Sequence, residues 1–159
     1  MFILSILILS LVYSLEVLNK FNLTWTTSNS HIKFTLYQSI NKGYIGLGLK
    51  SPQGDSSMSD SDIWVFDLEN HLVSDHHSKD NSFPNYDYKN SLQSVEFSQD
   101  GKIIEWTRKM LTKDFEDIEI TLDKYKLLWC IGRIVRGKIS QHLYGDAYRG
   151  VVLIDIRNP

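Results

Sequence analysis

The chain has 159 residues, and its 17 Lys and Arg nearly balance its 19 Asp and Glu, which leaves a net charge of −2. The basic residues are scattered, which argues against nucleic acid and anionic membranes as partners. The length suits one domain and is too short for two. Cys130 is the only cysteine, so an internal disulfide framework is excluded. Because Cys130 lies in an apolar run, we interpret it as a buried thiol, with a disulfide to a partner chain as the alternative.

The N-terminal residues 1–14 are apolar and end in the small residue Ser14. Such a stretch is too short to span a bilayer and is typical of a secretory signal peptide, with an uncleaved anchor as the alternative. We therefore predict a signal peptide over residues 1–14, a single domain over residues 15–159, a secreted or extracytoplasmic protein, and no membrane span after cleavage. The sequon Asn-Leu-Thr makes Asn22 a predicted glycosylation site.

Beyond this segment, apolar and polar residues alternate in short runs, and helical periodicity is hard to find. Residues 31–37 alternate most clearly, which predicts a half-buried strand. Residues 43–49 contain recurring glycines, which indicate either close approach of a backbone or ligand, or a strongly twisted strand. Further strands are predicted at residues 62–68, 71–75, 91–97, 103–108, 118–122, 124–131 and 150–156, and a surface loop at residues 78–90. Short strands at regular spacing predict an all-β, two-sheet sandwich.

Two polar loops hold residues that could bind a metal. Met58 lies in a run of serines and aspartates, and His142 lies in a distant polar turn. An exposed loop methionine is the plain interpretation of Met58, and a metal site formed by a thioether and an imidazole is the alternative. His76 and His77, with His71 nearby, could also suggest a divalent metal, but neighbouring strand residues point to opposite faces.

The acidic residues give no clear sign of catalysis. Asp55, Asp60 and Asp62 lack the spacing of a known calcium loop. Asp114 and Asp117 fit a turn that caps backbone amides better than an acid–base pair. Ser-His-Asp, Cys-His and phosphate-loop patterns do not occur. We therefore predict no catalytic activity for this chain alone.

Several features occur in an order that resembles the DOMON domain family. They are Trp25, the glycine-rich segment 43–49, Met58-x-x-Ser61-Asp62-Ile63, Val73-Ser74-Asp75, Arg108-x-x-x-Thr112-x-Asp114-x-x-Asp117-x-x-Ile120, Leu128-Trp129, and His142 followed by Arg149-Gly150. The likeness covers nearly all of residues 15–159 and implies an immunoglobulin-like two-sheet β-sandwich. It looks most like the N-terminal DOMON module of dopamine β-hydroxylase-like copper monooxygenases, although Lys113 stands where those relatives commonly have a cysteine.

The resemblance to cytochrome-type DOMON domains implies a b-type heme held between Met58 and His142. Arg149 could meet a heme propionate, and a structural turn into the last strand is its alternative role. The apolar slot for the porphyrin would be lined by Tyr44, Leu47 and Trp64. With both axial positions filled, such a centre would transfer electrons and leave little access for oxygen or substrate.

The resemblance leaves two kinds of function open. One is a secreted, non-catalytic heme- or ligand-binding module that transfers electrons to or from a redox partner or monooxygenase. The alternative is a cofactor-free module that binds carbohydrate or protein, or the N-terminal regulatory module of a truncated copper-dependent monooxygenase. Those enzymes carry their copper sites in downstream domains, and the chain ends at Asn158-Pro159, so no copper chemistry is expected within it.

Overall fold

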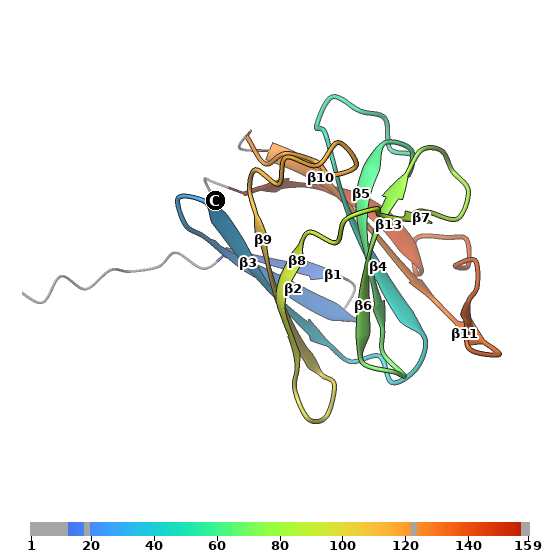
Figure 1. Ribbon diagram of the computed structural model, residues 1–159. Coiled ribbons are helices and arrows are strands. Elements are labelled where there is room, and N and C mark those ends of the chain that lie inside the picture. The colour runs from blue at the N-terminus through green and yellow to red at the C-terminus, as the bar shows by residue number, and fades with distance from the viewer. Residues whose placement is uncertain (1–12, 18–19, 122–123, 157–159) are drawn as a thin grey trace, which may run out of the picture.

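Alternating apolar and polar residues build two main antiparallel sheets that pack face to face as a sandwich (Figure 1). The computed structural model describes residues 13–17, 20–121 and 124–156. These residues form strands, turns and loops without a helix, so none of them forms an apolar helix that could cross a membrane. The predicted all-β, two-sheet sandwich is therefore confirmed.

The strands are β1 Tyr13–Val17, β2 Phe21–Thr27, β3 His31–Gln38, β4 Tyr44–Lys50, β5 Ser61–Asp67, β6 Leu72–Ser78, β7 Asn85–Tyr86, β8 Leu92–Phe97, β9 Ile103–Lys109, β10 Lys124–Gly132, β11 Ile134–Val135, β12 Lys138–Ile139 and β13 Arg149–Asp155. One sheet has the order β1-β2-β3-β9-β8, and the other has the order β13-β10-β4-β5-β6-β7. A small ribbon of β11 and β12 is separate from both. β4 therefore lies inside the larger sheet, between β10 and β5.

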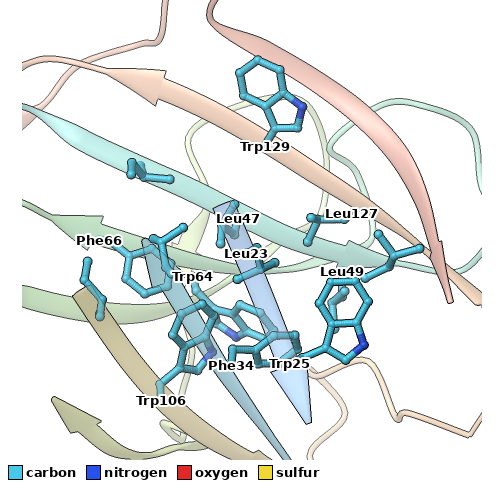
Figure 2. Close-up of a cluster of buried hydrophobic side chains, with 14 of the residues drawn as sticks. Leu23, Trp25, Phe34, Leu47, Leu49, Trp64, Phe66, Trp106, Leu127 and Trp129 are labelled. Carbon is cyan, nitrogen blue, oxygen red and sulfur yellow. The ribbon is translucent and has the colours of Figure 1, made fainter. Parts of the chain in front are cut away.

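Aromatic rings fill the space between the two sheets (Figure 2). The ring of Phe34 lies 5.1 Å from both Trp64 and Trp106, and the ring of Phe66 lies 4.7 Å from Trp106. Trp64 and Trp106 are fully buried, and Trp25 and Trp129 are also in the core. Truncating such a residue to alanine typically costs about 3–5 kcal/mol. This packed interior holds the inner face of the larger sheet in place.

The strand predictions were mostly confirmed, with errors near the N-terminus and before β10. β2 was missed because its outward face is rich in polar residues, although its inward residues Phe21, Leu23 and Trp25 alternate. The predicted strand at residues 118–122 was wrong for its described part, residues 118–121. There the backbone follows an irregular path. β7 is a short strand within the predicted loop 78–90.

The predicted signal peptide lies almost entirely outside the described residues. Its last two residues, Tyr13 and Ser14, belong to β1 and pair with Trp25 and Thr24 of β2. The predicted boundary after Ser14 therefore falls inside a strand. Cleavage there would leave a shortened β1, and the signal peptide stays a prediction.

Candidate functional site

A cavity of about 550 Å³ lies over the outer face of the larger sheet. The pairing register aligns two rows of side chains across this face, Val65–Gly46–Cys130–Arg149 and Ile63–Gly48–Leu128–Val151. All but Val65 line the cavity, so these rows form its floor. The volume lies within the range of roughly 300–1,000 Å³ that is typical of small-molecule and cofactor sites.

The two floor glycines of β4 leave room for their neighbours to lie across the strand. A Cβ at Gly46 would lie 2.7 Å from Cys130 Sγ, and a Cβ at Gly48 would lie 3.2 Å from Ile63 Cγ1. Side chains from β10 and β5 therefore occupy the space above these glycines. The recurring glycines of the sequence thus make a shallow floor beneath the cavity.

Met58 lies in the loop between β4 and β5 and lines the cavity from that side. Its side chain is half-buried and packs against a small apolar cluster formed by Tyr44, Ile63 and Val65. Its backbone N–H donates to Asn81 Oδ1 over 3.0 Å, and Asn81 also lines the cavity. The predicted plain role, an exposed loop methionine, does not describe this half-buried position.

Buried Lys50 fixes the loop that carries Met58. Its Nζ donates to Asp55 Oδ1 over 2.6 Å and to the Ser57 carbonyl oxygen over 3.1 Å. The hydrogen bond from Lys50 is the main reason that the pKa of Asp55 lies below its usual value. Lys126 Nζ donates to the Gly54 carbonyl oxygen of the same loop. Two cations from β4 and β10 therefore hold the backbone leading to Met58.

His142 lies in the connection between β12 and β13 and lines the cavity from the other side. Its Nδ1 lies 3.1 Å from the Leu143 carbonyl oxygen, and because a carbonyl only accepts, we assign the proton to Nδ1. Nε2 then keeps a free lone pair, as in most metal-binding histidines. β13 and β5 are separated by β10 and β4, so the loops that precede them border the floor from opposite sides.

Arg149 begins β13 and places a cation at the rim of the cavity. Its guanidinium carbon lies 4.7 Å from the ring centroid of Tyr144, a cation–π contact. Gln141 Nε2 donates to Tyr144 Oη over 2.9 Å, which fixes that ring. Among the described residues, no carboxylate forms an ion pair with Arg149. Its charge is therefore available to an anionic group in the cavity.

The predicted lining of the slot was partly wrong. Leu47 is among the residues that border the cavity, but it pairs with Trp64 in the register, so both side chains face the core on the opposite side of the sheet. Tyr44 lies near Met58 but outside the lining, and its Oη donates to the Ser140 carbonyl oxygen over 2.9 Å. Burial is the main reason that the pKa of Tyr44 is raised. Alternation along β5 could have excluded Trp64, because Trp64 and the floor residue Ile63 point to opposite faces.

Sequence reasoning also missed residues that the fold brings to the cavity. They include Asn81, Leu128, Cys130, Tyr144 and Asp146. Cys130, predicted to be a buried thiol, is half-buried beside the cavity, and burial raises the pKa of its thiol to about 11. Alternation along β10 could have shown that Leu128 and Cys130 share one face of the strand. It could not have shown that they pair with Gly48 and Gly46 of β4, because that depends on the register. The loop residues had no sequence signal of their own.

The other candidate metal ligands do not join the cavity. His76 and His77 are consecutive in β6 and therefore point to opposite faces, as predicted. His76 is buried, with Nε2 at 2.8 Å from Ser74 Oγ, and burial lowers the pKa of His76. His71 stacks on Phe97 with ring centroids 5.2 Å apart. His76 and His71 therefore pack against neighbouring side chains, and none of the three histidines lines the cavity.

The predicted turn at Asp114 and Asp117 is half right. Asp114 Oδ1 accepts a hydrogen bond from the Glu116 N–H over 3.1 Å, so Asp114 caps a backbone amide as predicted. Asp117 does not share this role, because its carboxylate is buried and accepts from Ser91 Oγ over 3.2 Å. Asp117 belongs to a group of buried acids in the interior.

Asn22 is half-buried on β2, where it pairs with Glu16 of β1 and Tyr37 of β3. Its neighbours Phe21 and Leu23 point into the core, so Asn22 lies on the outer face of the smaller sheet. Glycosylation of Asn22 stays a prediction.

Comparison with known proteins points to one family. A family model described as DOMON domain matches residues 18–132. The fold is similar to the cytochrome b domain of pyranose dehydrogenase from Coprinopsis cinerea, with a TM-score of 0.54 and 16% sequence identity over 84% of this chain and 76% of that chain. It is also similar to the cytochrome domain of Myriococcum thermophilum cellobiose dehydrogenase, with a TM-score of 0.56 and 12% identity over 92% of this chain and 82% of that chain. A search of curated proteins found no match.

Proposed function

The chain belongs to the DOMON domain family, and from this premise we propose that its cavity binds a b-type heme with Met58 and His142 as axial ligands. One observation carries the proposal. Two residues far apart in the sequence, a thioether and an imidazole, line one cavity from loops on opposite sides of its floor. The similarity in fold to two domains named as cytochromes supports it.

The residues around the cavity fit such a group. The assigned Nδ1 proton of His142 leaves Nε2 free to bind iron, and the carbonyl of Leu143 orients the ring. The apolar side chains of Ile63, Leu128 and Val151 offer a floor that keeps water away from the ring. Arg149 supplies a cation for a propionate. When held by Met58 and His142, a heme would supply one-electron transfer, and the two side chains would leave little access for a substrate.

We further propose that the chain is a non-catalytic electron carrier that meets a redox partner at the rim of the cavity. Leu143, Tyr144 and Tyr148 lie in the same connection as His142 and are 45%, 66% and 37% exposed. Exposed apolar groups rimmed by polar ones are typical of interaction sites. A dehydrogenase is the class of partner that we propose, because the two similar solved structures are domains of dehydrogenases. A copper-dependent monooxygenase is the alternative partner, and it rests on the sequence resemblance alone.

The test is a titration of the purified full chain with hemin, followed by reduction. We expect a low-spin spectrum that sharpens on reduction. Met58→Leu and His142→Leu should each lose the low-spin form while far-ultraviolet circular dichroism stays that of a folded sandwich. Met110→Leu in the core and His31→Ala at the surface are matched controls and should keep the spectrum.

Two results would reject parts of this proposal. A folded chain that gives no Soret band would reject heme binding and favour a cofactor-free module that binds carbohydrate or protein. A low-spin spectrum that survives in both ligand variants would reject Met58 and His142 as the ligands.

We also propose that the protein is exported and carries a glycan on Asn22. Expression in a eukaryotic secretory host should give a glycosidase-sensitive mass increase that Asn22→Gln removes. N-terminal sequencing of the secreted chain would locate the cleavage site, and a start at Leu15 would support the proposed signal peptide. A chain retained in the cells with its N-terminus intact would contradict export.

A further inference from the structure

A second cluster of charged side chains lies inside the sandwich, away from the outer-face cavity. One carboxylate oxygen from each of Asp62, Asp75 and Asp117 lies within 4.8 Å of the others. The three residues are 0%, 4% and 8% exposed. Asp62 is near the start of β5, Asp75 is on β6, and Asp117 is in the connection between β9 and β10. We call these three residues the acidic cluster.

The pairing register explains why two of these acids meet. Asp75 pairs with Trp64, and Trp64 points into the core, so Asp75 points inward as well. Asp62 lies two residues before Trp64 and therefore shares its face. The acidic cluster thus replaces apolar core at one end of the sandwich.

One cationic side chain, Arg108, forms an ion pair with the acidic cluster. Arg108 is fully buried on β9, and its Nη1 forms an ion pair with Asp62 Oδ2. Its Nη2 donates to the Ile118 carbonyl oxygen over 2.8 Å. Among the described residues, no other Lys or Arg forms an ion pair with the cluster. Three ionised carboxylates would therefore leave two negative charges uncompensated in the interior, which is strongly unfavourable.

Each member of the acidic cluster has a buried oxygen without a hydrogen-bond partner among the described residues. These atoms are Asp62 Oδ1, Asp75 Oδ1 and Asp117 Oδ2. Ser91 holds two of the carboxylates by their other oxygens, because its Oγ lies 2.8 Å from Asp75 Oδ2 and 3.2 Å from Asp117 Oδ1. Buried carboxylate oxygens that are oriented but unpaired need a ligand or a proton.

Asp87 adds a fourth acid beside the cluster. Both of its carboxylate oxygens are buried and unpaired among the described residues, and its backbone N–H donates to the Asp75 carbonyl oxygen over 3.1 Å. Burial, followed by the charges of Asp75, Asp62 and Asp117, raises the pKa of Asp87 to about 8. The four acids therefore act on one another electrostatically.

We propose that the acidic cluster binds one Ca²⁺ ion, with Asp62, Asp75 and Asp117 as ligands and Asp87 completing the shell directly or through water. The carboxylates of Asp62, Asp75 and Asp117, the Arg108 guanidinium and one divalent cation sum to zero charge when Asp87, whose pKa burial raises to about 8, keeps its proton. The donors are all hard oxygens, which suit Ca²⁺ or Mg²⁺ and disfavour zinc and copper. Ca²⁺ is favoured because it accepts irregular carboxylate sets, whereas Mg²⁺ keeps several waters that a buried site cannot easily hold.

Protons are the rival means of neutralising the cluster. Burial raises the pKa of Asp75 to about 6, so protonation near neutral pH could replace the cation. The two alternatives differ in their response to added calcium, because a protonated cluster needs none. The proposal does not depend on heme binding, and its test uses heme-free protein.

The experiment is calorimetric titration of the EDTA-treated, heme-free full chain with CaCl2 at pH 7.5, followed by thermal unfolding with CaCl2 or EDTA. We expect one site per chain and a rise in Tm with CaCl2. Asp117→Asn keeps the size of the side chain but removes a ligand charge, so the Kd for CaCl2 should rise by about tenfold or more. Asp100→Asn in an exposed turn is the matched control and should bind like the native chain.

Two outcomes would overturn the proposal. Absence of binding heat together with an unchanged Tm at millimolar CaCl2 would show that protons neutralise the cluster. Binding that is unchanged in Asp117→Asn, and also in Asp75→Asn in case the first variant is compensated, would place the ion elsewhere. Terbium luminescence gives a second readout that does not depend on stability.

Discussion

The outer-face cavity and the inner acidic cluster are built on opposite faces of the same strand. β5 turns Ile63 outward into the cavity floor and turns Asp62 inward to Arg108. The outer site offers a thioether and an imidazole from two loops, and the inner site offers carboxylates from β5, β6 and the connection between β9 and β10. Strand side chains alternate between the two faces of a sheet, so the adjacent residues Asp62 and Ile63 belong to different sites. One site offers carboxylate oxygens, and the other offers sulfur and nitrogen. The sheet register, more than the local sequence, therefore decides which side chains meet in each site.

The largest effect should come from removing the one cation of the inner site. Arg108→Met leaves buried carboxylates without their partner, and breaking a buried pair in this way typically costs about 3–5 kcal/mol in the free energy of unfolding. Urea unfolding with EDTA should show this loss, and saturating CaCl2 should recover part of it because Ca²⁺ supplies positive charge.

Lys33→Met is the control for Arg108→Met. Lys33 pairs with Glu105 over 3.0 Å on the surface, where its side chain is 50% exposed. Exposed pairs contribute about 0–1 kcal/mol, and calcium should not change that loss. Equal losses in the two variants would contradict the buried role of Arg108.

The next effect is a pH dependence that only the inner site should show. The raised pKa of Asp75, about 6, means that the folded cation-free chain keeps a proton that the unfolded chain loses above pH 4. The contribution of Asp75 to the free energy of unfolding is therefore fully present below pH 4. It falls as the pH rises through 6, by about 2 kcal/mol for a mostly buried group. Asp87 should extend the decline toward pH 8.

Calcium should suppress this decline because it binds the ionised cluster. Urea unfolding from pH 4 to pH 8, with EDTA and with CaCl2, would measure both curves. The other titratable or charged groups facing Asp75 are Asp62, Asp87, Asp117, Arg108 and, opposite Asp62 in the register, His77. Parallel curves with and without CaCl2 would contradict a calcium site.

The outer site is tested through its floor. Gly46→Ala places a Cβ 2.7 Å from Cys130 Sγ, and overpacking of this kind costs about 1–3 kcal/mol. The displaced thiol would also raise the cavity floor and weaken hemin binding. The double variant Gly46→Ala, Cys130→Ala removes the clash and should recover most of both losses. Additive losses in the double variant would show that the clash is not the cause.

The sequence predicted the outer site better than the inner one, and the physical reason differs for each. Met58 and His142 could be named because the family resemblance gives both positions, even though no local pattern joins them. As a metal ligand, Asp62 was considered only with Asp55 and Asp60, its neighbours in the chain. Asp55 pairs with Lys50 instead, and Asp60 is exposed.

The true neighbours of Asp62 come from other strands and connections, so they follow from the register of β5 and β6 and the path of the β9–β10 connection. Alternation predicted most strands because burial of one face requires it. Alternation does not say which strands pair, and the pairing creates both sites. Trp64 shows the limit within a single strand, since its face was misassigned although β5 itself was predicted.

The smallest expected effect would join the two sites, and it rests on both proposals. Met58 lies four residues before Asp62, and the Asp60 N–H between them donates to the Ser78 carbonyl oxygen over 2.6 Å. Calcium that bridges Asp62 of β5 and Asp75 of β6 would restrain the start of β5 and with it the loop of Met58. A restrained loop loses less entropy when it binds a ligand, so the Kd for hemin should be about fivefold lower in CaCl2 than in EDTA.

Hemin titrations of the native chain and of Asp117→Asn, each with CaCl2 and with EDTA, would measure this coupling. The native chain should show it and the variant should lose it, because a calcium ion that no longer binds cannot order the loop. Equal hemin affinity in calcium and in EDTA, with both ligands still binding, would mean that β5 carries two independent sites. The alternation of side chains along β5 would then place different ligands on its two faces without coupling their binding.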